Sequence, residues 1–123
     1  METVTQTQLP TLRGLLESRI GDLRAELQAA AAVRDERVAA STSELLDQKD
    51  EVDIRQRREV DAQSERLAAA DLACCEAALR RIDEGVYGDC VDCGEPIAPP
   101  RLKVRPQAER CHDCQEMHER ASA

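Results

Sequence analysis

The chain has 123 residues, a formal net charge of −8 at pH 7 and 34% charged residues. Its aromatic content is 1%, a single Tyr87 with no Phe or Trp, which is too little for an ordinary globular core. This composition favours long solvated helices. The acidic balance argues against nucleic acid as the main partner, because surfaces that neutralise phosphates are basic. We therefore expect no direct DNA binding.

No apolar run in the sequence is long enough to cross a membrane, and no signal peptide is evident at Met1. Six cysteines without a targeting segment are typical of a reducing compartment, where thiolates are free to bind metals. We therefore predict a cytoplasmic protein without a membrane partner.

The first predicted element follows a segment, residues 1–8, that has no periodicity and is predicted to be a disordered tail. From there, apolar residues recur three or four positions apart, which predicts one face of a helix. They are Leu9, Leu12, Leu16, Ile20, Leu23, Leu27 and Ala31. Pro10 suits a first helical turn, whereas Gly14 and Gly21 lower helix propensity. We expect packing to hold this segment together.

A second helix is predicted from about residue 51 to about residue 84, after a polar turn rich in cap-forming residues. Its second half carries a four-three seam typical of coiled coils. The seam consists of Ala68, Leu72, Cys75, Leu79, Ile82 and Val86. Gly85 is predicted to end the helix. On this pattern Cys75 is a buried small hydrophobe and Cys74 a surface thiol.

Two helices of this length predict an antiparallel coiled-coil hairpin over residues 9–84, with its tip near residues 41–52. The seam is apolar near the base and increasingly polar toward the tip. Coiled coils that serve only dimerisation usually keep an apolar seam to the end. The polar tip therefore indicates a rod that presents its end to another molecule. We expect a monomer, because an intramolecular hairpin needs no second chain.

Residues 85–123 are predicted to form a small zinc finger with two Cys-x-x-Cys pairs, Cys90/Cys93 and Cys111/Cys114. Zn²⁺ takes four thiolates in a tetrahedron, and this separation of two pairs is typical of a four-cysteine site. We predict one structural Zn²⁺ with no open coordination position. The alternative is four unrelated thiols or two disulfides, which the absence of secretion signals disfavours.

The rest of this segment has two further predicted elements. Basic and apolar residues alternate over residues 101–105, which predicts a short strand that Pro106 closes. The segment from Cys111 to about Arg120 is predicted to be a short terminal helix. We interpret His112 as a surface residue, since four thiolates already complete the metal site. The predicted fold class is thus mostly α, a helical hairpin joined to a four-cysteine finger.

The pattern GxYGxCxxCGxxIxxxRLxxxPxxxxCxxC fits residues 85–114 and resembles the TraR/DksA C4-type zinc-finger family. The residues between the cysteines make the match specific: they are Gly94, Ile97, Arg101, Leu102 and Pro106. The resemblance is close in sequence over the finger, whereas over the hairpin it lies in the architecture. It implies a non-enzymatic transcription regulator that binds RNA polymerase. In the family, the hairpin enters the secondary channel and its acidic tip changes the stability of open promoter complexes.

The family's tip motif, Asp-x-x-Asp followed by a small residue, falls on Asp47 and Asp50, with Val52 at the small position. The resemblance therefore assigns these residues to the active-site region of the polymerase. Asp also caps helices, and capping is the alternative role for both aspartates. The two roles are compatible, because a cap fixes where its carboxylate points.

The resemblance also implies contacts with polymerase or ppGpp for Arg101 and Arg105, with a solvated surface arginine as the equal alternative for Arg101. Cys74 and Gln115 occupy positions that are basic in ppGpp-responsive members. A polyphosphate site needs several cations, so this loss weakens the case for ppGpp. The chain is also shorter at its N-terminus than the longer members.

Two other functions remain open from the sequence. One is a Gre-like secondary-channel factor that stimulates transcript cleavage through an acidic coiled-coil tip, although such factors carry a β-rich second domain. The other is a zinc-finger adaptor or DNA-binding protein, which the net charge of −8 disfavours.

Overall fold

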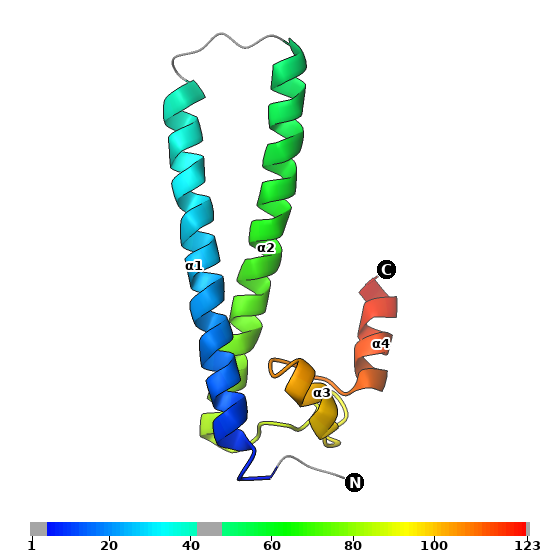
Figure 1. Ribbon diagram of the computed structural model, residues 1–123. Coiled ribbons are helices and arrows are strands. Elements are labelled where there is room, and N and C mark those ends of the chain that lie inside the picture. The colour runs from blue at the N-terminus through cyan, green and yellow to red at the C-terminus, as the bar shows by residue number, and fades with distance from the viewer. Residues whose placement is uncertain (1–4, 42–47, 123) are drawn as a thin grey trace. The chain divides into compact units, whose positions relative to one another are not determined.

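The computed structural model describes the backbone of residues 5–41 and 48–122, and the side chains of residues 5–38 and 51–122. The described secondary structure is four helices: α1 (Leu9–Ser41), α2 (Gln48–Glu84), α3 (Pro99–Val104) and α4 (His112–Ser122) (Figure 1). An isolated β-bridge pairs Asp89 with Pro96. Among the described residues, no helix has the combination of length and apolar character that crossing a membrane needs.

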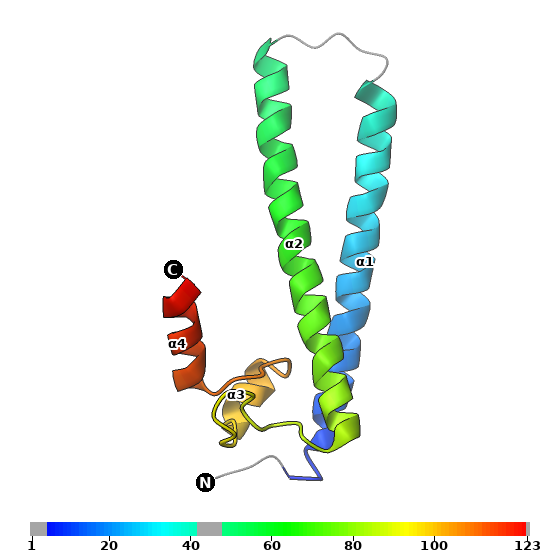
Figure 2. The same ribbon diagram turned by 180° about the vertical axis from the view of Figure 1, so that it is seen from behind.

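The chain divides into two compact units. Unit 1 holds the chain up to Ile20 together with the chain from Ala73 onward, and unit 2 holds Gly21–Leu72. Both long helices contribute to both units, and within each unit α1 and α2 run antiparallel and side by side in the two views (Figure 1, Figure 2). The predicted helical hairpin and finger are thus confirmed as a mostly helical fold.

The helix pair in unit 1 has a core of buried apolar side chains. Leu12, Leu16 and Ile20 of α1 are buried at positions four apart, which is the helical face that the sequence predicts. From α2, Cys75 and Ala78 are both fully buried. Cys75 therefore acts as the small hydrophobe that was predicted, and Cys74 is exposed. An ion pair between Arg13 and Asp83 joins the two helices at 2.7 Å.

Helix α2 ends one residue before Gly85, whose φ of 78° lies in the left-handed region that glycine adopts without steric cost. The amide of Val86 donates a hydrogen bond to the carbonyl oxygen of Arg81, which closes the last turn. Val86 was predicted on the seam, but its side chain is 46% exposed because the helix has already ended.

The strand predicted over residues 101–105 is wrong, because α3 occupies Pro99–Val104. Pro99 and Pro100 stand in the first helical turn, where their missing N–H groups need no partner. In a strand, Leu102 and Val104 would share a face, whereas in a helix they point in different directions. Leu102 is fully buried and Val104 is 82% exposed, as the helix requires.

Outside these helices, residues 5–8 lie in the segment predicted to be a disordered tail, and they form a hydrogen-bonded turn before α1. The amide of Gln8 donates to the carbonyl oxygen of Thr5 at 3.0 Å, and the amide of Thr5 donates to the side-chain oxygen of Gln8 at 2.9 Å.

Candidate metal centre

The first cysteine pair lies on a tight chain reversal. The amide of Gly94 donates to the carbonyl oxygen of Cys90 at 3.0 Å, and the amide of Cys90 donates to the carbonyl oxygen of Glu95 at 2.8 Å. Gly94 has a φ of 76°, so the reversal uses a backbone conformation that L-residues disfavour. This turn brings the sulfurs of Cys90 and Cys93 to the same side.

The second pair is built on the start of α4. Cys111 precedes the helix and Cys114 lies in its first turn, where the amide of Gln115 donates to the carbonyl oxygen of Cys111 at 2.9 Å. A helical turn therefore replaces the glycine-based reversal of the first pair.

The two cysteine pairs are also tied to each other. The amide of Val91 donates to the carbonyl oxygen of Glu109 at 2.9 Å. The guanidinium of Arg110 donates to Asp92 at 2.7 Å, and its side chain is only 18% exposed. Arg110 also pairs with Glu109 at 2.7 Å. The sequence analysis missed this link; its signal is a pair of opposite charges, one between Cys90 and Cys93 and one just before Cys111.

The four sulfurs form a cluster in which all lie within 4.8 Å of one another. The sulfurs of Cys93 and Cys111 are 3.8 Å apart. A tetrahedron with Zn–S bonds of about 2.3 Å has S···S edges of roughly 3.8 Å, whereas a disulfide needs about 2.0 Å. All four cysteines are free thiols, so the disulfide alternative is wrong. The cluster fits one Zn²⁺ ion.

The thiol pKa values also favour a cation at this place. Burial raises the pKa of Cys90, but backbone N–H groups of Cys93, Cys111 and Asp92 outweigh burial and lower this pKa to about 6. Hydrogen bonding to Cys111, followed by burial, raises the pKa of the Cys114 thiol. The Cys90 thiol thus ionises readily, whereas the Cys114 thiol keeps its proton because of the hydrogen bond to Cys111 and burial. A divalent metal bound to the four sulfurs favours the thiolate form of each, so all four can ionise.

The cluster rests on a small apolar platform in unit 1. Cys90 is buried together with Ile97, Leu102 and Ala108 of the finger and Leu12 of α1. Tyr87, Cys111 and Cys114 are partly buried against this group. The platform covers one side of the sulfur cluster. The four thiolates would fill every position of a tetrahedral ion, as in structural zinc sites.

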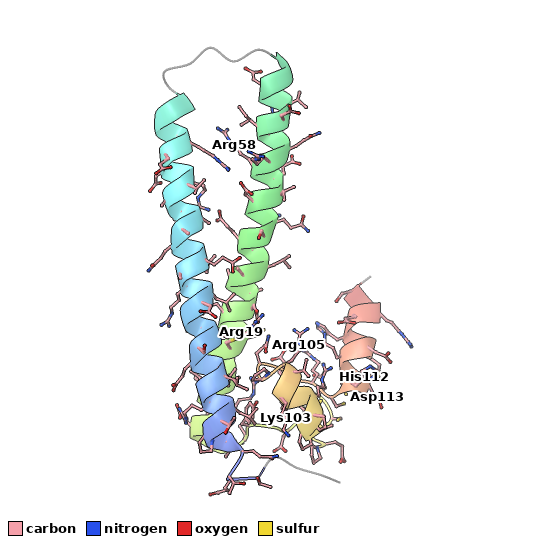
Figure 3. All side chains as sticks on the ribbon, viewed as in Figure 1. Arg19, Arg58, Lys103, Arg105, His112 and Asp113 are labelled. Carbon is pink, nitrogen blue, oxygen red and sulfur yellow. The ribbon has the colours of Figure 1, made fainter. Side chains whose placement is uncertain are left out.

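His112 is a surface residue, as predicted, with a side chain that is 70% exposed (Figure 3). Its ring nitrogens lie 3.7 Å from the carboxylate of Asp113 and 3.8 Å from that of Glu116.

The predicted tip residues are described only in part. Asp47 lies outside the described residues, and Asp50 is in the first turn of α2 with a side chain that also lies outside them. Val52 is on α2 and its side chain is 48% exposed.

The two predicted contact arginines line one hollow of about 460 Å³ on the finger, together with Val104 and His112. Arg101 is half-buried and its Nε donates to the carbonyl oxygen of Arg110 at 3.2 Å, so it is not a freely solvated arginine. Arg105 is exposed (Figure 3).

Comparison with known proteins gives three kinds of match. Residues 85–120 match the family model described as the prokaryotic dksA/traR C4-type zinc finger. The chain is 49% identical over 45 residues to the RNA polymerase-binding transcription factor DksA of Caulobacter vibrioides, which is 37% of this chain and 32% of that protein. It is 38% identical over 81 residues to an uncharacterized protein of Aquifex aeolicus, which is 66% of this chain and 46% of that one.

The third match is a solved structure, that of transcription factor DksA2 from Pseudomonas aeruginosa. The TM-score is 0.74 with 26% identity, over 95% of this chain and 87% of that one. The curated matches thus span about a third to a half of their relatives, whereas the structural match spans nearly the whole chain.

Proposed function

Because the chain belongs to the DksA/TraR C4 zinc-finger family, we propose that it is a cytoplasmic transcription regulator that binds RNA polymerase. On this proposal the protein acts as a monomer, inserts the tip of its hairpin into the secondary channel and does not bind DNA. The observation that carries the proposal is the likeness to DksA2 over 95% of this chain, which includes both long helices as well as the finger.

The tip aspartates are the proposed effectors. Asp50 lies in the first turn of α2, where the positive end of the helix dipole favours a carboxylate. Together with Asp47 it would bring negative charge to the polymerase active-site region, where carboxylates bias the coordination of Mg²⁺. Exposed Val52 would contact the polymerase beside them. These groups alter the stability of the open complex and catalyse no reaction.

The finger supplies the second proposed contact surface. Zn²⁺ bound by Cys90, Cys93, Cys111 and Cys114 would hold the two cysteine pairs in fixed positions. Arg101 and Arg105, which line one hollow, would then present their charges to the polymerase. ppGpp is a candidate ligand at this interface. Exposed Cys74 and half-buried Gln115 add no positive charge, so we expect ppGpp to have a weaker effect than in members with three cations.

The lifetime of open complexes at a ribosomal RNA promoter tests the proposal. The lanes compare no factor, the native protein, Asp50→Asn and Asp53→Asn, each with and without ppGpp. Asp53 is an exposed acid three residues further along α2, so it controls for the loss of one negative charge. Polymerase binding is measured for each variant in parallel.

We expect the native protein and Asp53→Asn to shorten the lifetime, and Asp50→Asn to bind polymerase without shortening it. If the native protein binds but leaves the lifetime unchanged, the proposed effect is wrong, and transcript cleavage is the next assay. If it does not bind polymerase, the proposed partner is wrong. Salt-sensitive binding to duplex DNA would instead support the DNA-binding alternative.

A further inference from the structure

The seam between α1 and α2 changes its chemistry within unit 2. Positions spaced four and three apart continue without a break on both helices, which keeps them on the facing sides. On α1 they are Leu23, Leu27, Ala30, Arg34 and Arg37, and on α2 they are Leu72, Ala68, Glu65, Asp61 and Arg58. The first members of each series are apolar, whereas the last members are charged. The charged members are Arg34, Arg37, Arg58, Asp61 and Glu65. We call these five residues the charged seam.

Two ion pairs connect the helices across the charged seam. Arg34 pairs with Glu65, and Arg37 pairs with Asp61 at 2.7 Å. These pairs are only partly withdrawn from solvent, because the side chain of Arg34 is 57% exposed and that of Asp61 is 44% exposed. By contrast, Leu23 and Ala68 are buried, at 7% and 6% exposure. Charge therefore replaces apolar packing along one continuous register.

The space around these pairs is open. A groove of about 300 Å³ is lined by Ala30, Arg34 and Glu65 among others, and a second of about 370 Å³ by Arg37, Arg58 and Asp61 among others. Both are large enough for several water molecules and dissolved ions. Ion pairs that water and salt can reach are weak and screened by salt.

Arg58 leaves the charged seam with an unbalanced cation. It lies on the side of α2 that faces α1 (Figure 3), and its side chain lines the second groove. Among the described side chains, the two acids of the charged seam are already paired with Arg34 and Arg37, and no ion pair involves Arg58. A third arginine beside two paired arginines repels them, which weakens the association further.

We propose that the charged seam is a salt-sensitive latch, which lets α1 and α2 separate locally while the apolar part of unit 2, at Leu23 and Ala68, stays packed. Helices in proteins depend on tertiary packing for most of their stability. Where α1 and α2 separate, their helical hydrogen bonds therefore open more often and their backbone amides exchange faster. The latch concerns the folding of unit 2 alone and does not depend on the proposed function.

Amide hydrogen exchange of the zinc-loaded full chain at about 20 mM and about 500 mM salt tests the latch. These conditions take the screening length from roughly 20 Å to about 4 Å. We expect exchange over residues 31–38 and 58–66 to become about two- to fivefold faster at high salt. We expect the exchange rate over residues 12–23 and 68–79 to rise by a smaller factor. No salt effect, or an equal effect in both sets, overturns the proposal.

Charge reversal at one pair provides the second test. Arg34→Glu and Glu65→Arg each place like charges across the seam, so each is expected to speed exchange there at low salt by about two- to fivefold. The double variant restores the opposite charges and should return exchange to within about twofold of the native rate. Failure of the double variant to recover overturns the latch.

Two more variants separate the seam from net charge. Arg57→Glu makes the same charge change on an exposed residue of α2 that is outside the seam register, so it should leave exchange unchanged. Arg58→Leu removes the unbalanced cation and should slow exchange over residues 58–66. A faster rate in Arg58→Leu, or an effect of Arg57→Glu equal to that of Arg34→Glu, contradicts the proposal.

Discussion

The hydroxyl of Tyr87 donates a hydrogen bond to the carbonyl oxygen of Pro106 at 2.8 Å. This bond joins the segment just before the first cysteine pair to the turn after α3. Tyr87 is half-buried against the apolar platform and is the only aromatic residue of the chain. The bond therefore links two parts of the finger independently of the metal.

The first prediction concerns the ionisation of Tyr87. Burial raises the pKa of its phenol to about 12, against an opposing effect of Arg81. Since the folded pKa lies above the unfolded value of about 10, the stabilisation is complete below pH 10 and is lost as the pH rises through about 12. Phenolate absorbance reports this residue alone. We expect a midpoint near 12 in the folded chain and about 10 in denaturant.

Tyr87→Phe is the matching variant, because it keeps the ring and removes the hydrogen bond. We expect a loss of roughly 0.5–1.5 kcal/mol in unfolding free energy at neutral pH. The variant should also lack the loss of stability above pH 10. If the Tyr87 phenol titrates at the same pH in the folded native chain as in denaturant, the phenol is neither buried nor hydrogen-bonded.

The second prediction concerns zinc. Cys93→Ser is expected to reduce the zinc content to well below one ion per chain, because a hydroxyl is a poor substitute for a thiolate ligand. Cys74→Ser is the matched control, since Cys74 is exposed and outside the cluster. Chelation of the native chain should make residues 86–120 sensitive to protease while circular dichroism shows that most helix remains. Full zinc content in Cys93→Ser, or a protease-resistant finger after chelation, would show that the four-thiolate site is wrong.

The metal site was predictable from sequence because its ligands are close in the chain and their spacing is set by coordination chemistry. The first helix was predictable for a similar reason, since its apolar period is long and starts at Leu9, next to a proline that suits a first helical turn. The segment at 101–105 was mispredicted because alternation over five residues is too short to distinguish a strand from a helix. The two preceding prolines were the stronger signal.

Other features had no local signal. The pairing of Arg34 with Glu65 depends on which turns of two antiparallel helices face each other, and this depends on the register of the whole hairpin. The bond from Tyr87 to Pro106 connects residues 19 positions apart through the finger fold. Long-range contacts of this kind follow from the tertiary structure and not from any sequence pattern.

The third prediction concerns the core of unit 1. Leu16 is fully buried, whereas the adjacent Leu15 is 44% exposed. Leu16→Ala should lower the unfolding free energy by about 2–5 kcal/mol, because it removes packed methyl groups and leaves a cavity. Leu15→Ala removes the same atoms from a partly solvated site and should cost clearly less. Chemical denaturation of both variants checks this, and equal losses would mean that the helical face is misassigned.

The fourth prediction compares two glycines. Gly94 has a φ of 76°, but a Cβ at this position would meet no atom within 4 Å. Gly94→Ala therefore tests backbone strain alone and should cost about 1–2 kcal/mol. Gly21 lies in α1 with similar free space, so Gly21→Ala should stabilise by up to about 1 kcal/mol. Denaturation midpoints that shift in the same direction would contradict the backbone argument.

The fifth prediction concerns the ion pair between Arg110 and Asp92, which bridges the two cysteine pairs at 2.7 Å. The backbone amide of Asp92 also hydrogen-bonds to the Cys90 sulfur. Loss of the ion pair should therefore let this backbone segment move and loosen the geometry around the Cys90 ligand. We expect Asp92→Asn to speed zinc transfer to a chelator by about tenfold or more, in line with other residues that orient metal ligands. Asp89→Asn makes the same charge change one residue before Cys90, on an exposed side chain, and serves as the control. If both variants release zinc at the native rate, the bridge does not support the metal site; if both release it equally fast, the effect is due to charge and not to the bridge.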